Sequence, residues 1–178
     1  MLKSLYVAAR WYALAICVVL LDQVTKNAAT ALLDYGRPKE VFFWFDFTLH
    51  HNVGAAFSFL SSAGGWQRWF FTILALLVSA MLVFWLKSLQ RSQWVLGAGL
   101  ALILGGALGN VWDRMVLGYV VDFISVHYRD WYFPTFNIAD AAISVGAVLV
   151  VIDSLVSGPG NDGAGEAHAR GKEAERDE

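Results

Sequence analysis

The sequence SQWVLGAGLALILGGALGNVW, residues 92–112, contains no charged residue and lies between Arg91 and Asp113. A helix needs about 20 residues to cross the hydrocarbon core of a bilayer, so this stretch predicts a membrane span. Small residues recur in it at every fourth position, at Gly97, Ala101, Gly105 and Gly109. That spacing lets a second helix approach closely, which predicts a tightly packed helix bundle.

The composition of the chain agrees with a membrane protein. Of its 178 residues, 57% are hydrophobic and only 16% are charged, whereas soluble domains have about 25% charged residues. A second uncharged segment, residues 69–86, predicts another span. The net charge of -2 gives no reason to expect nucleic-acid binding, and the single cysteine, Cys17, excludes a disulfide framework within the chain.

The first and last spans contain acidic residues. At 1.5 Å per residue, the first uncharged run is too short to cross a bilayer. We therefore expect that span to cover residues 11–33, through Asp22 and Lys26. The last apolar run is also too short, and we expect its span over residues 136–156, with Asp140 within or at the edge of the bilayer.

Basic residues in short segments predict the orientation of the chain, because they favour the cytoplasmic side. Four of them occur before the first span and between the second and third, at Lys3, Arg10, Lys87 and Arg91. We therefore expect both termini in the cytoplasm and regions 34–67 and 113–135 outside. The polar, glycine-rich tail, residues 158–178, is expected to be disordered in the cytoplasm.

The outer regions predict a small β-sheet. Apolar side chains alternate along the first one, at Phe43, Phe45, Phe47 and Leu49, and this period of two is typical of a strand. Residues 119–128 are rich in Val, Tyr, Phe and Ile and predict further strands. The expected fold is one domain, residues 1–157, mainly α-helical, with four transmembrane helices and a small sheet on the outer membrane surface.

Asp122 and Asp140 are the candidate catalytic residues. No cation is adjacent to either one in sequence, and both flank the same short outer connection. Two carboxylates that meet at low dielectric share a proton, so one acts as a base and the other as an acid. Such a pair can activate water and protonate a peptide carbonyl. Two separate structural aspartates fit the residues equally well.

Other chemistries fit less well. Asp22 and Lys26 are four residues apart on one helix face, which favours a structural ion pair. There is no Gly-x-Ser-x-Gly turn and no His-Glu-x-x-His helix. Ser125 and His127 would share one face of a strand, so a Ser/His device is a weaker alternative. We interpret His50 and His51 as hydrogen-bonding residues, not metal ligands.

Five motifs together resemble one family, the bacterial lipoprotein signal peptidases (signal peptidase II). The resemblance covers about residues 11–156. The motifs are Asp22-Gln23-x-x-Lys26, Asn52-x-Gly54-Ala55-Ala56-Phe57, Gly105-Gly106-x-x-Gly109-Asn110-x-x-Asp113-Arg114, Val121-Asp122-Phe123 and Phe136-Asn137-x-Ala139-Asp140. Each motif alone is weak, but five in the family's order are highly specific.

The resemblance implies a multi-pass aspartic endopeptidase of the bacterial inner membrane, with its site near the periplasmic face. Its substrates would be diacylglyceryl-modified prolipoproteins, cut just before the lipidated cysteine. Asp122 and Asp140 match the catalytic residues. The positions expected to bind substrate or support the site are Asp22, Lys26, Asn52, Gly54, Asn110, Arg114 and Asn137. We expect no cofactor or metal, contact with membrane lipids, and a monomer.

Two other functions remain open from the residues alone. A proton-coupled transporter or channel would use Asp22, Asp122 and Asp140 as a relay, and a non-catalytic assembly protein would need only its glycines. The acids gather near one surface, which favours a site open to one side. Residues 54–65 (GAAFSFLSSAGG) are bounded by glycines, and we expect either a mobile lid over the aspartates or a fixed amphipathic turn.

Overall fold

A computed structural model describes residues 2–54 and 65–156 of the chain. The expected polar tail and all of the expected lid except its terminal glycines, Gly54 and Gly65, lie outside the described residues.

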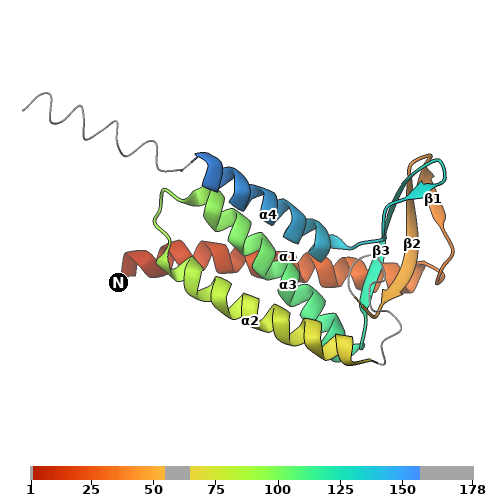
Figure 1. The fold of residues 1–178 in the computed structure, drawn as a ribbon, viewed down its shortest axis with the longest axis horizontal. Helices are drawn as coiled ribbons and strands as arrows, with labels where there is room; N and C mark the ends of the chain where they lie inside the picture. The colour runs from red at the N-terminus through yellow and green to blue at the C-terminus, as the bar shows by residue number, and fades with distance from the viewer. Residues whose placement is uncertain (1, 55–64, 157–178) are drawn as a thin grey trace, which may run out of the picture.

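Four long helices pack side by side: α1 (Leu2–Leu32), α2 (Trp66–Ser88), α3 (Trp94–Val116) and α4 (Ile138–Val156). By length and composition all four can cross a membrane, α1 through its segment Ala8–Leu32. The start of α1 and the end of α4 lie at the same end of the bundle, away from the sheet (Figure 1). The prediction of four membrane helices is confirmed.

The strands form one antiparallel sheet at the other end of the bundle (Figure 1). Its order is β1 (Lys39–Phe42), β2 (Phe45–Asn52), β3 (Val120–Tyr128) and β4 (Trp131–Tyr132). The small sheet is confirmed, but the expected strand began at Phe43, and the structure places Phe43 and Trp44 in the turn between β1 and β2. The alternation of apolar residues does not show where the chain turns back, so it could not separate β1 from β2.

Helix α3 is the centre of the bundle, and its glycines face two neighbours. A methyl group on Gly105 would lie 2.7 Å from the carbonyl oxygen of Ala15 on α1. Gly99 instead faces α4, where a methyl group would lie 2.8 Å from the carbonyl oxygen of Gly146. The four-residue repeat predicted that another helix would approach closely, but it did not identify that helix as α1 and did not predict the second approach, to α4.

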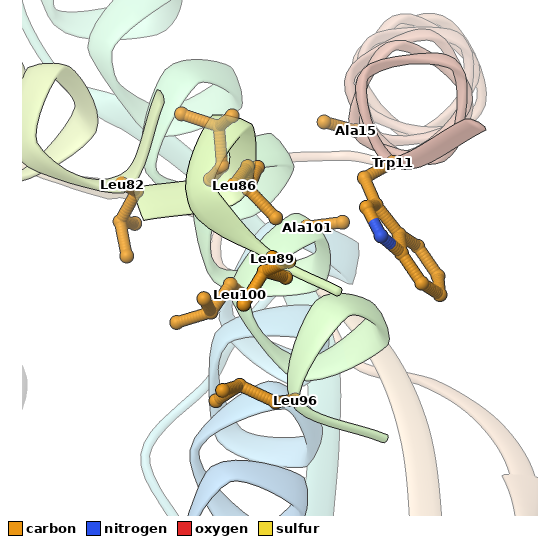
Figure 2. Close-up of a cluster of buried hydrophobic side chains, with 9 residues drawn as sticks. Trp11, Ala15, Leu82, Leu86, Leu89, Leu96, Leu100 and Ala101 are labelled. Atoms are coloured by element: carbon orange, nitrogen blue, oxygen red, sulfur yellow. The ribbon is translucent and has the colours of Figure 1, made fainter. Parts of the chain in front are cut away.

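An apolar core cluster and the buried charged residues lie at opposite ends of the bundle. Figure 2 shows the apolar cluster, in which Trp11 of α1 lies near leucines of α2 and α3, including Leu86 and Leu100. Its members come from the helix ends that are far from the sheet. Aspartates, asparagines and a lysine are buried at the sheet end, together with apolar residues such as Val120 and Phe123, so the buried charges of the described residues gather there.

Candidate active site

Asp122 lies on β3 and is 2% exposed, and Asp140 lies in the first turn of α4. An isolated antiparallel bridge between Ile124 and Phe136 holds the segment before α4 against β3. Asn137 then contacts both aspartates. Its side-chain Nδ2 donates to Asp122 Oδ1 at 2.7 Å, and its backbone N–H donates to Asp140 Oδ2 at 3.4 Å. The structure therefore brings the two carboxylates to one place.

Asn137 and Asp140 also form a reciprocal cap on α4. The amide oxygen of Asn137 accepts the backbone N–H of Asp140 at 2.9 Å, while Asp140 accepts the backbone N–H of Asn137. This is the hydrogen-bond pattern of a capping box, with Asn and Asp in the places that Ser and Glu usually take. The start of the helix thus fixes the rotamer of Asp140.

Hydrogen bonds to other groups determine which way the remaining site amides point. The oxygen of Asn52 accepts the backbone N–H of Gly54 at 3.0 Å, so its Nδ2 faces Asp122 Oδ2, also at 3.0 Å. The oxygen of Asn110 accepts from Lys26 Nζ at 3.0 Å, so its Nδ2 donates to Asp140 Oδ1 at 2.8 Å. Both aspartates therefore receive oriented donors from several elements.

A buried ion cluster lies beside the aspartates. Lys26 Nζ is 2.8 Å from Asp22 Oδ2 and 2.9 Å from Asp113 Oδ2, and all three side chains are almost inaccessible. Sequence reasoning expected Asp22 and Lys26 but left Asp113 out of the site. The sequence did contain a signal for Asp113. It directly follows the charge-free span 92–112, near the outer ends of the helices, where Lys26 was also expected.

A large cavity opens beside the pair. Its volume is about 1140 Å³, and its lining includes Asp122, Asp140, Asn52, Asn110 and Arg114. Apolar residues of α4, Ile143 and Val145, form another part of its wall. Small-molecule sites usually measure about 300–1,000 Å³. The space therefore suits a larger, partly apolar ligand.

Among the described residues, Arg114 is the one arginine or lysine in the lining of this cavity. Its Nη2 donates to the carbonyl oxygen of Gly54 at 3.3 Å, and its guanidinium lies 5.6 Å from the ring centroid of Phe71. These contacts hold the positive charge near both aspartates.

The surroundings favour the protonated form of Asp122. Burial and the nearby charge of Asp140 raise the pKa of Asp122 from 3.8 to about 7. Hydrogen bonds from Asn52 and Asn137 and the charge of Lys26 act in the opposite direction but do not cancel the shift. A carboxyl group that still holds a proton near neutral pH can donate it in a reaction.

The alternative residues make other contacts. His127 Nε2 lies 3.1 Å from Asp46 on β2, and no hydrogen bond joins His127 to Ser125 within the described residues. His50 Nδ1 lies 3.0 Å from the hydroxyl oxygen of Thr135, and the ring of His51 stacks on Tyr119. Burial and the charge of His50 lower the pKa of His51.

The sequence of this chain matches a known protein family over most of its length. Residues 14–156 match the family described as signal peptidase (SPase) II. This chain belongs to the signal peptidase II family. Signal peptidase II enzymes are peptidases, and the four apolar helices make this member a multi-pass membrane protein.

Curated relatives cover most of the chain. The lipoprotein signal peptidase of Teredinibacter turnerae is 55% identical over 83% of this chain and 88% of its own length. That of Acinetobacter baumannii is 55% identical over 82% of both chains. The similarity therefore extends over nearly the full length of these signal peptidase II proteins.

Solved structures also match this signal peptidase II chain. A chain described as a bacterial membrane enzyme has a TM-score of 0.75 and 32% identity, covering 86% of this chain and 91% of its own. A second, described in the same way, has a TM-score of 0.70 and 33% identity. The helix bundle with its end sheet is thus shared by related membrane enzymes.

Every predicted site residue lies at the sheet end of the bundle. Asp122, Asp140, Asn52, Gly54, Asn110 and Arg114 line the cavity. Asn137, Asp22 and Lys26 lie in the hydrogen-bonded layer next to it. Their roles in this signal peptidase II remain predictions.

Proposed function

We propose that this chain is an aspartic endopeptidase that removes the signal peptide from diacylglyceryl-modified prolipoproteins, cutting just before the lipidated cysteine. Family membership and the activity named for its relatives support the reaction class. The observation that carries the aspartic mechanism is the meeting of Asp122 and Asp140 at one cavity through their common neighbour Asn137.

In the proposed reaction Asp140 is the base. It lies in the first turn of α4, where the helix dipole stabilises negative charge, and it accepts the hydrogen bond from Asn110. Asp140 takes a proton from water as the water oxygen attacks the scissile carbonyl carbon. Asp122 gives its proton to the carbonyl oxygen, which forms a tetrahedral diol.

Collapse of the diol completes the reaction. Asp122, now ionised, takes a proton back from a diol hydroxyl as the carbonyl re-forms. The proton on Asp140 passes to the departing amide nitrogen as the C–N bond breaks. The shared proton returns to the pair, so both roles are restored for the next substrate.

The cavity fits a substrate that is part peptide and part lipid. Arg114 and Asn52 offer hydrogen bonds to an unwound backbone, which would otherwise leave polar groups unpaired in lipid. The apolar wall includes Val145, which is 53% exposed on α4, so an acyl chain can reach it from the side. We place the enzyme in the bacterial inner membrane, as a monomer with its site near the periplasmic face.

The test is cleavage of a synthetic diacylglyceryl lipobox peptide by the purified full chain in micelles. Asp122→Asn and Asp140→Asn should each lower turnover at least about 100-fold, because each removes one proton site and preserves the shape of the side chain. The double variant should be no slower than either single one, since the pair acts as a unit.

Asp130→Asn is the matched control, because Asp130 is an exposed aspartate in the turn between β3 and β4. It should retain full activity. Clear turnover by either purified single variant of the pair would refute the aspartic assignment, and equal cleavage of a peptide without lipid would refute the substrate class.

A further inference from the structure

Two carboxylates outside the catalytic pair hold the backbone one residue before each member of it. Asp22 Oδ1 accepts the backbone N–H of Ala139, the residue before Asp140, at 2.9 Å. Asp113 Oδ2 accepts the backbone N–H of Val121, the residue before Asp122, at 3.1 Å. In both contacts a buried carboxylate accepts the backbone N–H of the residue that precedes a catalytic aspartate, once at the start of α4 and once on β3.

A single lysine joins these two contacts. Lys26 Nζ lies 2.8 Å from Asp22 and 2.9 Å from Asp113. Hydrogen bonds to charged groups are shorter and stronger than those between neutral groups. A continuous chain of such bonds therefore runs from the backbone beside Asp140, through Asp22, Lys26 and Asp113, to the backbone beside Asp122.

None of these three side chains lines the cavity within the described residues. A direct contact with substrate therefore does not explain them. Burial makes them expensive to maintain, since each ion loses its hydration and is balanced only by its neighbours.

We propose that Asp22, Lys26 and Asp113 form a brace that sets the separation of the two catalytic carboxylates. The three are positioning residues, and this inference rests on the proposed aspartic mechanism. Errors of about 1 Å in the placement of reacting groups can cost about 100-fold in rate, so a fixed separation matters for catalysis.

Two neighbours keep the brace in place. Gln23 Nε2 donates to Asp113 Oδ1 at 2.8 Å, which occupies the oxygen that Lys26 does not use. A methyl group on Gly109 would lie 2.6 Å from Asp22 Oδ2, so α3 approaches Asp22 closely only because a glycine is present. The charges of the brace are therefore held on both sides by residues of α1 and α3.

The test uses Asp113→Asn and Asp22→Asn. Each removes one of two carboxylates that share one ammonium, so a balanced ion pair remains and the fold should survive. An asparagine at either position can still accept the backbone N–H through its oxygen. In Asp22→Asn the NH2 group then points at the ammonium of Lys26, because Ala139 and Lys26 use different oxygens of Asp22, and the chain of bonds is broken there. In Asp113→Asn one oxygen, in the place of Oδ2, serves both Val121 and Lys26, so the NH2 group points at Gln23 Nε2 instead. The bonds to Val121 and Lys26 then lose the charge that strengthens them, and the chain is weakened.

Each single variant should lower kcat at least about 10-fold, with KM and binding of a lipidated peptide with a reduced scissile bond changed less than about twofold. The double variant should be no slower than the slower single one, because one break already disconnects the brace. Asp46→Asn is the control: Asp46 is also buried and paired, with His127, but lies outside the brace, and its kcat should not change.

Three outcomes would overturn the brace. They are full kcat in both single variants, losses that multiply in the double variant, and activity that falls only in proportion to folded protein. All three leave the aspartic mechanism intact if Asp122→Asn is inactive. Turnover by Asp122→Asn would instead refute the proposed function itself.

Discussion

At the scale of single residues, the geometry of the aspartate pair depends on asparagine side chains. Other hydrogen bonds fix the orientation of each of these amide groups. Asn137 donates to Asp122 and caps the helix that begins beside Asp140, so one side chain serves both carboxylates. The motif order located this residue, but no sequence pattern shows that its oxygen is occupied by a backbone N–H. That information exists only when β3 and the start of α4 are in contact.

The raised pKa of Asp122 predicts a pH-dependent stability. In the unfolded chain this group ionises near 3.8, whereas the folded chain keeps its proton up to about 7. Between these values the folded state binds more protons, so its stability falls as pH rises, by at most about 1.4 kcal/mol per pH unit. The contribution is fully present below pH 3.8 and lost above about pH 7.

Asp122→Asn removes this titration. Thermal unfolding in micelles at pH 4, 6 and 8 should show a midpoint difference that widens in favour of the variant as pH rises. One kcal/mol corresponds to about 2–4 °C for a protein of this size. A difference that stays constant from pH 4 to pH 8 would mean that Asp122 does not keep its proton in the folded protein.

At the scale of helices and strands, the sequence predicted the features that depend on the length and composition of one segment. It missed the features that depend on contact between two segments. Two long uncharged runs, and two shorter ones extended through acidic residues, predicted the four helices, and the alternation in 43–49 predicted a strand. The turn at Phe43, the contact of Asp113 with Val121 and the approach of Gly99 to Gly146 all require two elements to be in place. Pattern analysis of one segment at a time cannot supply these.

The α3–α4 contact predicts that Gly146→Ala destabilises the bundle. A methyl group there would lie 2.6 Å from the carbonyl oxygen of Gly99, and overpacking of this kind costs about 1–3 kcal/mol. Because α4 also presents Asp140, we expect a lower unfolding midpoint in micelles together with slower peptide cleavage.

Ala80→Leu adds more volume at an exposed position of α2 and serves as the control. Its midpoint and cleavage rate should match those of the unchanged protein. A Gly146→Ala protein as stable as this control would show that α3 and α4 can separate without loss.

At the scale of the whole molecule, the two ends of the bundle differ in charge and in polarity. Arg10 Nη2 lies 3.5 Å from the carbonyl oxygen of Arg91, at the end that also holds the apolar cluster. These two arginines and Lys87 would face the cytoplasm under the rule that favours positive charge inside. The buried acids, at the sheet end, would face the periplasm.

Cysteine labelling in intact cells tests this orientation. In a Cys17→Ala background, Gln90→Cys should react only after the inner membrane is permeabilised, and Asp130→Cys should react from the periplasm. Both positions are exposed, in the α2–α3 turn and the β3–β4 turn respectively. The reverse pattern would place the proposed site in the cytoplasm, where it could not meet exported precursors.

The sharing of Lys26 between two helices also affects how the protein is made. When α1 enters the membrane, Lys26 already has Asp22 four residues before it, so the helix brings a self-compensated pair into lipid. Asp113 enters the membrane only with α3. In the folded bundle its cationic partner is Lys26, which lies on α1 and already pairs with Asp22. Docking of α1 with α3 therefore gives the carboxylate of Asp113 a cationic partner, although one lysine then serves two acids. The apolar ends of the helices gain no comparable stabilisation from meeting in lipid. A nascent chain that misplaces α1 would leave an acid unmatched at the membrane surface, so correct assembly and a competent site would be achieved in the same step.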